Sequence, residues 1–417
     1  CKTSVINIYV SSTKLEAKGS DNVVVASIEE ALNSVLVYRE NKNKVPITIH
    51  LEAREYRLTS PIKIGPEYGA IEIVGAGADK TTIKGSEVLN LKWEKYNDHI
   101  WKAQLDAKTQ FDQLFINGQQ QILARYPNYD ENGGHWQGHA GDAIAKERVE
   151  NWSNASGAIV HAMHRGEWGG FHFRATGVDD NGELILEGGY QNNRPSAMNP
   201  KYRMVENVFE ELDSAGEWYL DSSNTLFYWP TTAMDLQNAK AEGVTQKHLI
   251  EISGTEENPV VGIAIHGIKF EHTQRTLFEE YEPLLRSDWT IYRGAAILLE
   301  GTKDVTIANS EFTNLGGNVI LVSNYNRGAS AISFVGSPSA VRSPSFQYSE
   351  FVPLAEMDTA KGPKSNKYPA DALVDNNLIH RIGRIEKQTA GVQIAMAMQI
   401  TVSNNSIYDV PRAGINV

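Results

Sequence analysis

The densest run of chemically active side chains spans residues 380–394, HRIGRIEKQTAGVQI. Glu386 lies near its centre, Arg381 and Arg384 precede it, and Gln393 follows it. A carboxylate held among basic and amide side chains can serve as a general acid or base. We therefore predict Glu386 as a catalytic residue and Arg381, Arg384 and Gln393 as binding residues. The alternative is a solvated turn in which Glu386 pairs with Arg384 or Arg381, as surface carboxylates commonly do.

Asp371, in the phrase KYPADALV, is the second candidate catalytic carboxylate. Arg125 and Tyr126, in LARYPN, belong to a different part of the chain, and we predict that they reach the same cleft as binding residues. The alternative for Arg125 and Tyr126 is a structural role in which they anchor one domain against another.

The longest irregular stretch, residues 336–372, supplies two further binding candidates, Arg342 and Tyr348. Five prolines in this stretch indicate an ordered loop rather than strands. Functional clefts are often built by such loops, so we predict contacts with a ligand from Arg342 and Tyr348. The alternative is that both are exposed loop residues with no such role.

Three histidines, His161, His164 and His172, lie close together in HAMHRGEWGGFHF. A metal site needs ligands whose spacing converges on one point, and no carboxylate–histidine pattern accompanies these residues. We therefore predict a strand that carries scattered imidazoles, and no metal site.

The composition narrows the class of partner. The chain has 417 residues and a net charge of -12 that is spread along its length, which argues against nucleic acid as a partner. An acidic polymer would have to be met by local basic clusters. No run of 18 or more apolar residues occurs, so the sequence predicts no membrane-spanning helix.

The only cysteine is residue 1. A chain that starts on Cys1 is typical of a processed bacterial lipoprotein whose first cysteine carries the lipid. We predict lipidation at Cys1, a polar tether over residues 1–22, and a place in the bacterial cell envelope, with secretion or the periplasm as alternatives. Membrane contact would come only through this anchor. The other explanation is a chain boundary that falls on a cysteine by chance.

The spacing of apolar residues divides the rest of the chain into three segments. Residues 23–90 begin with a helix, because Ser27 and Glu30 form a capping-box pattern, and continue as short alternating strands. Residues 91–240 hold seven of the eight tryptophans in strand-like runs separated by Gly, Asn and Asp, which predicts an inserted antiparallel β domain.

Residues 241–417 repeat themselves. A shift of 95 residues brings 297–322 onto 392–417, and within each copy equivalent apolar residues recur after 23 residues. A period in the low twenties made of short strands and turns is typical of a β-solenoid, in which each coil stacks on the next. Asn309, Asn376 and Asn404 recur at one turn, where left-handed backbone and stacked amides give them a structural role. The helix over residues 28–36 then caps the first coil.

These patterns resemble the pectin-lyase-like right-handed parallel β-helix proteins, and more narrowly the β-helix glycoside hydrolases of families 120 and 141. The phrases that carry the resemblance cover most of the chain: LFINGQQQILARYPN, GEWYLDSSNTLFYWP, KYPADALV, IHRIGRIEKQTAGVQIAMAMQITV and SIYDVPRAGINV. The resemblance implies an all-β fold, a right-handed parallel β-helix with an N-terminal capping helix and an inserted β-sandwich-like domain. It also agrees with a lipoprotein of Bacteroidetes-type bacteria.

The resemblance implies a glycoside hydrolase that uses two carboxylates on plant cell-wall or similar glycans, in the manner of a xylosidase, xylanase or fucosidase. Two departures accompany it: residues 324–336 leave little room for a full coil, and relatives continue beyond the PRAGIN phrase. Part of the site is therefore expected beyond Val417, and this chain alone could be inactive. The alternatives are a polysaccharide lyase, the only reading that would involve Ca²⁺, and a non-catalytic glycan-binding surface protein. The expected partner is an oligosaccharide or polysaccharide, with no other cofactor.

Overall fold

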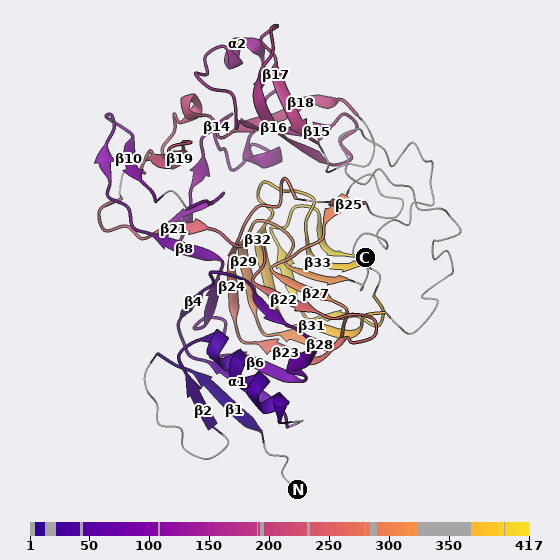
Figure 1. Ribbon diagram of the computed structural model, residues 1–417. Helices are drawn as coiled ribbons and strands as arrows, with labels where there is room; N and C mark the ends of the chain where they lie inside the picture. The colour runs from indigo at the N-terminus through magenta and orange to yellow at the C-terminus, as the bar shows by residue number, and fades with distance from the viewer. Residues whose placement is uncertain are drawn as a thin grey trace.

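The computed structural model describes most of the chain (Figure 1). The described ranges are 5–12, 22–41, 45–106, 109–189, 191, 196–231, 234–279, 281–283, 290–323, 368–395 and 397–417. Four of the predicted features lie outside them: the lipidation site Cys1, the binding candidates Arg342 and Tyr348, and the shortened stretch 324–336.

Three parallel sheets form the body of the molecule, and successive coils contribute one strand to each. The eight-stranded sheet has the order β2 (Asn22–Val25), β1 (Ile6–Val10), β3 (Ile47–Leu51), β6 (Ile71–Gly75), β23 (Val260–His266), β28 (Thr302–Ala308), β31 (Ala370–Asp375) and β34 (Thr401–Ser403). One six-stranded sheet has the order β4 (Glu55–Arg57), β7 (Thr82–Lys84), β24 (Lys269–Thr273), β29 (Glu311–Leu315), β32 (Leu378–Ile382) and β35 (Ser406–Tyr408). The other has β5 (Ile62–Ile64), β22 (Ile250–Ser253), β27 (Ile297–Glu300), β30 (Ile320–Ser323), β33 (Ala390–Ala395) and β36 (Ala413–Asn416). The predicted all-β parallel β-helix is confirmed.

The register shows how the coils form one core. Ile297 pairs with Ile320, and Ile320 pairs with Val392, so equivalent aliphatic residues stack directly on one another. Ile297 and Ile320 are partners in adjacent strands, which confirms the predicted period of 23 residues for one coil. The Phe270 and Phe312 rings are likewise stacked, with centroids 4.9 Å apart, and neither side chain is exposed. Burial of these stacks in a continuous column is the main stabilising term of a solenoid.

The turn asparagines have the structural role that the repeat predicts. Asn309, Asn376 and Asn404 all adopt positive φ, between 51° and 55°, a region that asparagine tolerates better than most residues. The Asn376 amide donates to the Asn309 side-chain oxygen at 2.7 Å, and Asn404 donates to Asp375 at 2.7 Å. The side chains therefore link the turn of one coil to the turn of the next.

Helix α1 (Ile28–Glu40) lies at the amino-terminal end of the stack, beside β1 and β2 (Figure 1). The Ser27 side chain accepts a hydrogen bond from the Glu30 backbone, and the Glu30 carboxylate accepts one from the Ala26 backbone at 2.8 Å. Ile28, Leu32 and other apolar residues on one face are buried against the first strands. A helix that covers the first coil shields backbone edges that would otherwise be open to another chain.

Between β7 and β22 the chain leaves the coils and forms three mostly antiparallel sheets, which stand above the β-helix in Figure 1. A four-stranded sheet joins them to the coils: β12 (Gln119–Gln120), β11 (Leu114–Ile116), β21 (Ala241–Val244) and β8 (Ser86–Leu89). A five-stranded sheet follows: β13 (Ile122–Leu123), β19 (Glu217–Leu220), β20 (Thr225–Tyr228), β10 (Trp101–Gln104) and β9 (Glu94–Lys95). The second five-stranded sheet has β14 (Arg125–Tyr126), β18 (Met198–Glu206), β15 (Ile159–His164), β16 (Gly170–Val178) and β17 (Leu184–Gly188).

Short elements complete this inserted region and the coils. They are α2 (Lys146–Val149), the 3-10 helices η1 (Pro66–Tyr68), η2 (His135–Gln137) and η3 (Phe209–Glu211), and a two-stranded sheet of β25 (Tyr281–Pro283) and β26 (Thr290–Tyr292). Within the described residues, no helix combines the length and the apolar character needed to cross a bilayer.

Candidate functional site

Two cavities meet inside the inserted region and at its contact with the coils. The larger has a volume of about 860 Å³ and the smaller about 260 Å³. Four residues line both: Asp112, Leu123, Trp218 and Arg275. Asp112 precedes β11, Trp218 lies on β19, and Arg275 follows β24 of the parallel β-helix. The junction, where the two cavities share these residues, therefore joins residues that are far apart in the chain. Carboxylate, guanidinium and indole groups thus meet at one point.

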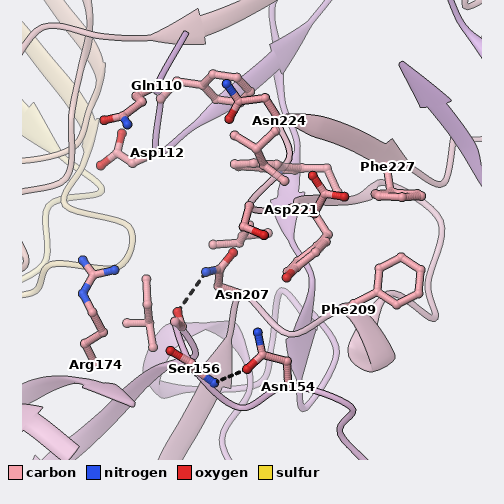
Figure 2. Close-up of a pocket in the computed structure, with 18 of the residues that line it drawn as sticks. Gln110, Asp112, Asn154, Ser156, Arg174, Asn207, Phe209, Asp221, Asn224 and Phe227 are labelled. Atoms are coloured by element: carbon pink, nitrogen blue, oxygen red, sulfur yellow. Dashed lines mark hydrogen bonds between the residues drawn. The ribbon is translucent and has the colours of Figure 1, made fainter. Parts of the chain in front are cut away.

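Aromatic rings and side-chain amides line the larger cavity, part of which is shown in Figure 2. The Phe209 and Phe227 rings pack edge to face with centroids 5.0 Å apart, and Tyr96 packs in the same way on Phe227 at 5.1 Å. The amides come from loops and turns between the strands: Gln110, Asn154, Asn207, Asn224 and Gln274. Flat apolar faces beside amide groups are suited to a ligand that is itself flat, apolar on one side and rich in hydroxyls.

The turns that carry these groups are held by their own side chains. Asn207 has a φ of 63°, and its amide donates to the Gly157 carbonyl at 2.9 Å, which joins β18 to the loop before β15 (Figure 2). Asp221 accepts hydrogen bonds from the Ser223 and Thr225 backbones at 2.9 and 2.7 Å. Such side-chain contacts fix the backbone at the rim of the cavity before any ligand binds.

The smaller cavity is rich in arginine. Arg125, Arg275, Arg381 and Arg384 line it, opposed by the carboxylates of Asp112 and Glu206. Three of the four arginines, Arg125, Arg381 and Arg384, are residues that the sequence predicted for binding. Arg125 comes from the inserted region, whereas Arg381 and Arg384 come from the end of β32 and the turn after it. The structure brings these three predicted residues to one cavity.

Arg125 is 2% exposed, and backbone carbonyls hold its guanidinium. Its Nε, Nη1 and Nη2 donate to the carbonyls of Pro127, Trp136 and Gly138 at 2.8, 2.7 and 2.8 Å. In the described part of the chain, no carboxylate forms an ion pair with Arg125. Burial lowers the pKa of this guanidinium, while the charges of Glu206 and Glu217 act in the opposite direction. A buried cation fixed by carbonyls keeps its charge available to the cavity.

Asp112 and Glu206 lie on either side of Arg275. Arg275 Nη1 is 2.6 Å from Glu206 Oε1, its Nε is 3.6 Å from Asp112 Oδ2, and its backbone N–H donates to Asp112 Oδ2 at 2.7 Å. Burial raises the pKa of Asp112 to about 6, because it outweighs the opposing effect of Arg275. Burial would also raise the pKa of Glu206, but Arg275 and His161 outweigh it and lower that pKa to about 2. The two carboxyl groups therefore differ in protonation over the range between these values.

A buried imidazole pair continues from Glu206 to the predicted catalytic residue Glu386. His161 Nε2 is 3.0 Å from Glu206 Oε1, and His161 Nδ1 is 2.6 Å from His172 Nδ1. His172 Nε2 is 3.3 Å from Glu386 Oε2, and Glu386 also accepts from the Gln388 backbone at 2.7 Å. Burial lowers the pKa of His161 to about 4, so this ring is neutral at pH 7.

Glu386 is 0% exposed and lines neither cavity. It pairs with His172, and not with Arg384 or Arg381 as the alternative from the sequence would have it. Arg384 instead pairs with Asp409, at 2.5 Å, and Arg381 donates to Asn314 at 3.4 Å. The position of Glu386 couples the turn after β32 to strands β15, β16 and β18 of the inserted region.

The remaining predicted residues lie elsewhere. The Tyr126 ring lies 3.1 Å from the Arg148 guanidinium, and its hydroxyl is 3.3 Å from Asp142, on the side of a different, acidic hollow. Asp371 is exposed on β31 with a φ of 59°. Gln393 is 1% exposed and accepts from Asn416 at 2.6 Å. Neither cavity includes these three side chains.

The sequence did not identify Asp112, Trp218, Glu206 or Arg275 as site residues. They come from four separate segments and no local motif surrounds them, so only the aromatic texture of residues 91–240 pointed to this region. The three histidines are partly brought together, since His161 contacts His172 whereas His164 stacks on Trp168 at 5.3 Å. In the described ranges, no group of three or more His, Cys, Asp or Glu side chains could hold a metal ion.

Comparison by sequence finds no matching protein family and no matching curated protein. Comparison by structure finds a solved glycoside hydrolase with a TM-score of 0.70 and 19% identity, over 99% of this chain and 79% of that one. A solved complex of XylC with xylose gives a TM-score of 0.43 and 11% identity, over 98% of this chain and 59% of that one. The likeness to the glycoside hydrolase shows that the two chains share an overall fold.

Proposed function

We propose that this protein is carbohydrate-active, and that it binds an oligosaccharide across the two joined cavities and hydrolyses it. The observation that carries the proposal is the junction, where Asp112 and Arg275 lie between an aromatic, amide-lined cavity and a charged one. The resemblance of the sequence to β-helix glycoside hydrolases supports the same reading, with plant cell-wall or similar glycans as the substrate class.

The larger cavity fits a sugar chain in size and chemistry. Its volume of about 860 Å³ lies within the range of about 300–1,000 Å³ that small-molecule sites occupy. A pyranose ring presents C–H groups on one face and hydroxyls at its edge. The rings of Tyr96, Phe209 and Phe227 would contact the C–H face, and the amides of Asn154 and Asn224 would bond the hydroxyls.

Asp112 has the properties of a general acid. Because its pKa is raised to about 6, the carboxyl group is protonated in mildly acidic solution and can donate to the leaving oxygen of a glycosidic bond. Glycosidases need a second carboxylate, which attacks the anomeric carbon or removes a proton from water. Asp221 is the candidate for this second carboxylate, because it is the other aspartate that lines the larger cavity. Figure 2 shows Asp221 at some distance from Asp112. Glu206 is 2% exposed and already bound by Arg275 and His161, so we assign it to positioning.

The test is sugar release from a panel of xylans, fucosylated glycans and pectic oligosaccharides, compared between the wild-type chain and Asp112→Asn. We expect Asp112→Asn to lower kcat by about 100-fold or more, since general acid catalysis contributes about 10²–10⁴, while oligosaccharide affinity stays within a few fold. Asp221→Asn is measured in parallel to test the second carboxylate.

The other outcomes separate the alternatives. If the protein binds an oligosaccharide but releases no sugar, its function is glycan binding rather than hydrolysis. If the product absorbs in the near ultraviolet, it contains an unsaturated sugar, and the reaction is that of a lyase rather than a hydrolase. Neither binding nor release across the panel would overturn the proposal as a whole.

A further inference from the structure

We propose that the smaller cavity binds the carboxylate of an acidic sugar, a uronic acid residue of the oligosaccharide. This inference rests on the proposed function and specifies its substrate class. The observation behind it is a difference in charge between the two joined cavities. Arg174 and Arg275 in the larger cavity are matched by Asp112 and Asp221. The smaller cavity has four arginines and only two carboxylates, Asp112 and Glu206.

Nearby carboxylates cancel only part of the positive charge of the smaller cavity. Arg275 is neutralised by Glu206 at 2.6 Å, and Arg384 is neutralised by Asp409, which does not line the cavity. Arg125 is bound by three carbonyls, and Arg381 by the neutral amide of Asn314. Among the described residues, neither Arg125 nor Arg381 forms an ion pair with a carboxylate. Because Asp112 also lines the cavity and is ionised above about pH 6, one guanidinium charge remains in excess near pH 7, and two remain when Asp112 is protonated.

The setting favours an anion over a neutral sugar. The chain as a whole is acidic, with a net charge of -12, so this local excess of arginine stands against the overall balance. Arg125 is 2% exposed and cannot turn away into solvent, because its three carbonyl bonds fix the plane of the guanidinium. Arginine matches a carboxylate through parallel N–H donors, and such bonds are roughly twice as strong as neutral ones.

The geometry also sets the direction in which the sugar chain would lie. Asp112, Leu123, Trp218 and Arg275 line both cavities, so a ligand that fills the junction enters both. The smaller cavity, at about 260 Å³, has room for a single sugar residue, and the larger, at about 860 Å³, for its neighbours. The acidic residue would occupy the arginine end, with neutral or acidic residues extending over the aromatic rings.

The experiment measures calorimetric affinities of oligosaccharides that contain galacturonate or glucuronate, each paired with its carboxyl-reduced counterpart. For the wild-type chain, we expect at least one uronate ligand to bind about 10-fold or more tightly than its reduced partner. The variant Arg381→Gln, which removes an exposed and uncompensated guanidinium of the cavity, should lower this ratio severalfold while keeping its affinity for the reduced ligand. Lys63→Gln, which removes one charge from a side chain that is 72% exposed on β5, should leave the ratio unchanged.

The failure of this inference is distinct from the failure of the proposed function. If the reduced ligands bind as tightly as the uronates, or if Arg381→Gln keeps the full ratio, the acidic substrate class is wrong although oligosaccharide binding stands. If no oligosaccharide binds, both proposals are overturned. The thermal unfolding temperature of each variant is measured as a control. A variant whose value lies within about 2 °C of the wild type is folded, so that its change in affinity is a change in binding.

Discussion

The coils and the inserted region solve the problem of burial in different ways. In the coils, the interior positions are filled by stacked aliphatic residues and phenylalanines such as Phe270 and Phe312. In the inserted region and at its contact with the coils, the buried positions include Arg125, Glu206 and the His161–His172 pair. Buried charges and imidazoles stabilise a fold poorly compared with apolar residues of the same size. A region that accepts this cost and borders the cavities is the part of the molecule most suited to binding and chemistry.

The difference also separates two kinds of asparagine and glutamine. Turn residues of the coils, such as Asn376, bond to the next coil and satisfy one another. Amides of the inserted region, such as Gln110 and Asn224, line the larger cavity instead, and the Asn224 amide also donates to the Asp106 carbonyl at 3.1 Å. Repetition along the coils therefore indicates a structural role, whereas the amides that line the larger cavity belong to segments that do not repeat.

The largest effect should come from an apolar position inside the coils. Phe312→Ala removes a ring that is 0% exposed and stacked on Phe270, and we expect it to lower the free energy of unfolding by about 4 kcal/mol. Denaturant titration measures the change. Val261→Ala on the outer face of β23, where the side chain is 45% exposed, is the control and should cost well under 1 kcal/mol. A loss below about 1 kcal/mol for Phe312→Ala would mean that the stacks do not carry the stability of the coils.

The next effect tests the buried charges of the inserted region. Arg275→Met leaves Glu206 without its main cation, and removing one member of a buried pair costs about 3 kcal/mol. The double variant Arg275→Met/Glu206→Gln should recover a large part of that loss, because the uncompensated charge is gone. Unfolding titrations of the two single variants and the double variant give the coupling. If the single and double variants are equally stable, the pair is not the buried contact described above.

A third effect, on affinity, follows from the raised pKa of Asp112. Below pH 6 this carboxylate becomes protonated, and a negative charge leaves the wall of the smaller cavity. We expect the preference for a uronate over its reduced form to increase about fivefold between pH 7.5 and pH 5, which corresponds to about 1 kcal/mol for one charge at close range. Calorimetry at the two pH values measures the change, and Asp112→Asn should remove the pH dependence. If the ratio of the wild type does not change between the two pH values, the charge of Asp112 does not affect the binding of the uronate.

The last effect, on stability, concerns the hydrogen-bonded turn asparagines of the coils. Asn376→Ala places an alanine at a φ of 51° and removes the bond to Asn309, and we expect a loss of about 1–2 kcal/mol. Asn376→Gly keeps the backbone conformation accessible and should cost less than the alanine variant. Thermal unfolding distinguishes the two. Equal losses for alanine and glycine would assign the whole effect to the hydrogen bond rather than to the backbone.

Local patterns were sufficient to predict the coils. The 23-residue period, the capping box at Ser27 and the left-handed turn at Asn309 are each properties of a few neighbouring residues and elementary sterics. The site was predicted only in part. Three residues predicted for binding, Arg125, Arg381 and Arg384, line one cavity, and their role in binding stays a prediction. Asp112 and Arg275 were not singled out, because their partners lie in other segments of the chain.

The sequence by itself determined that the chain folds into stacked coils with an aromatic insertion, because repetition and period depend on near neighbours along the chain. It also determined which side chains could carry a charge. Only the tertiary structure decided which charges meet: it buried Glu386 against His172, turned Asp371 outward, and brought Asp112, Glu206 and Arg275 together. The physical reason is that burial and long-range pairing set the pKa and the accessibility of a carboxylate, and neither property can be read from its neighbours in the chain.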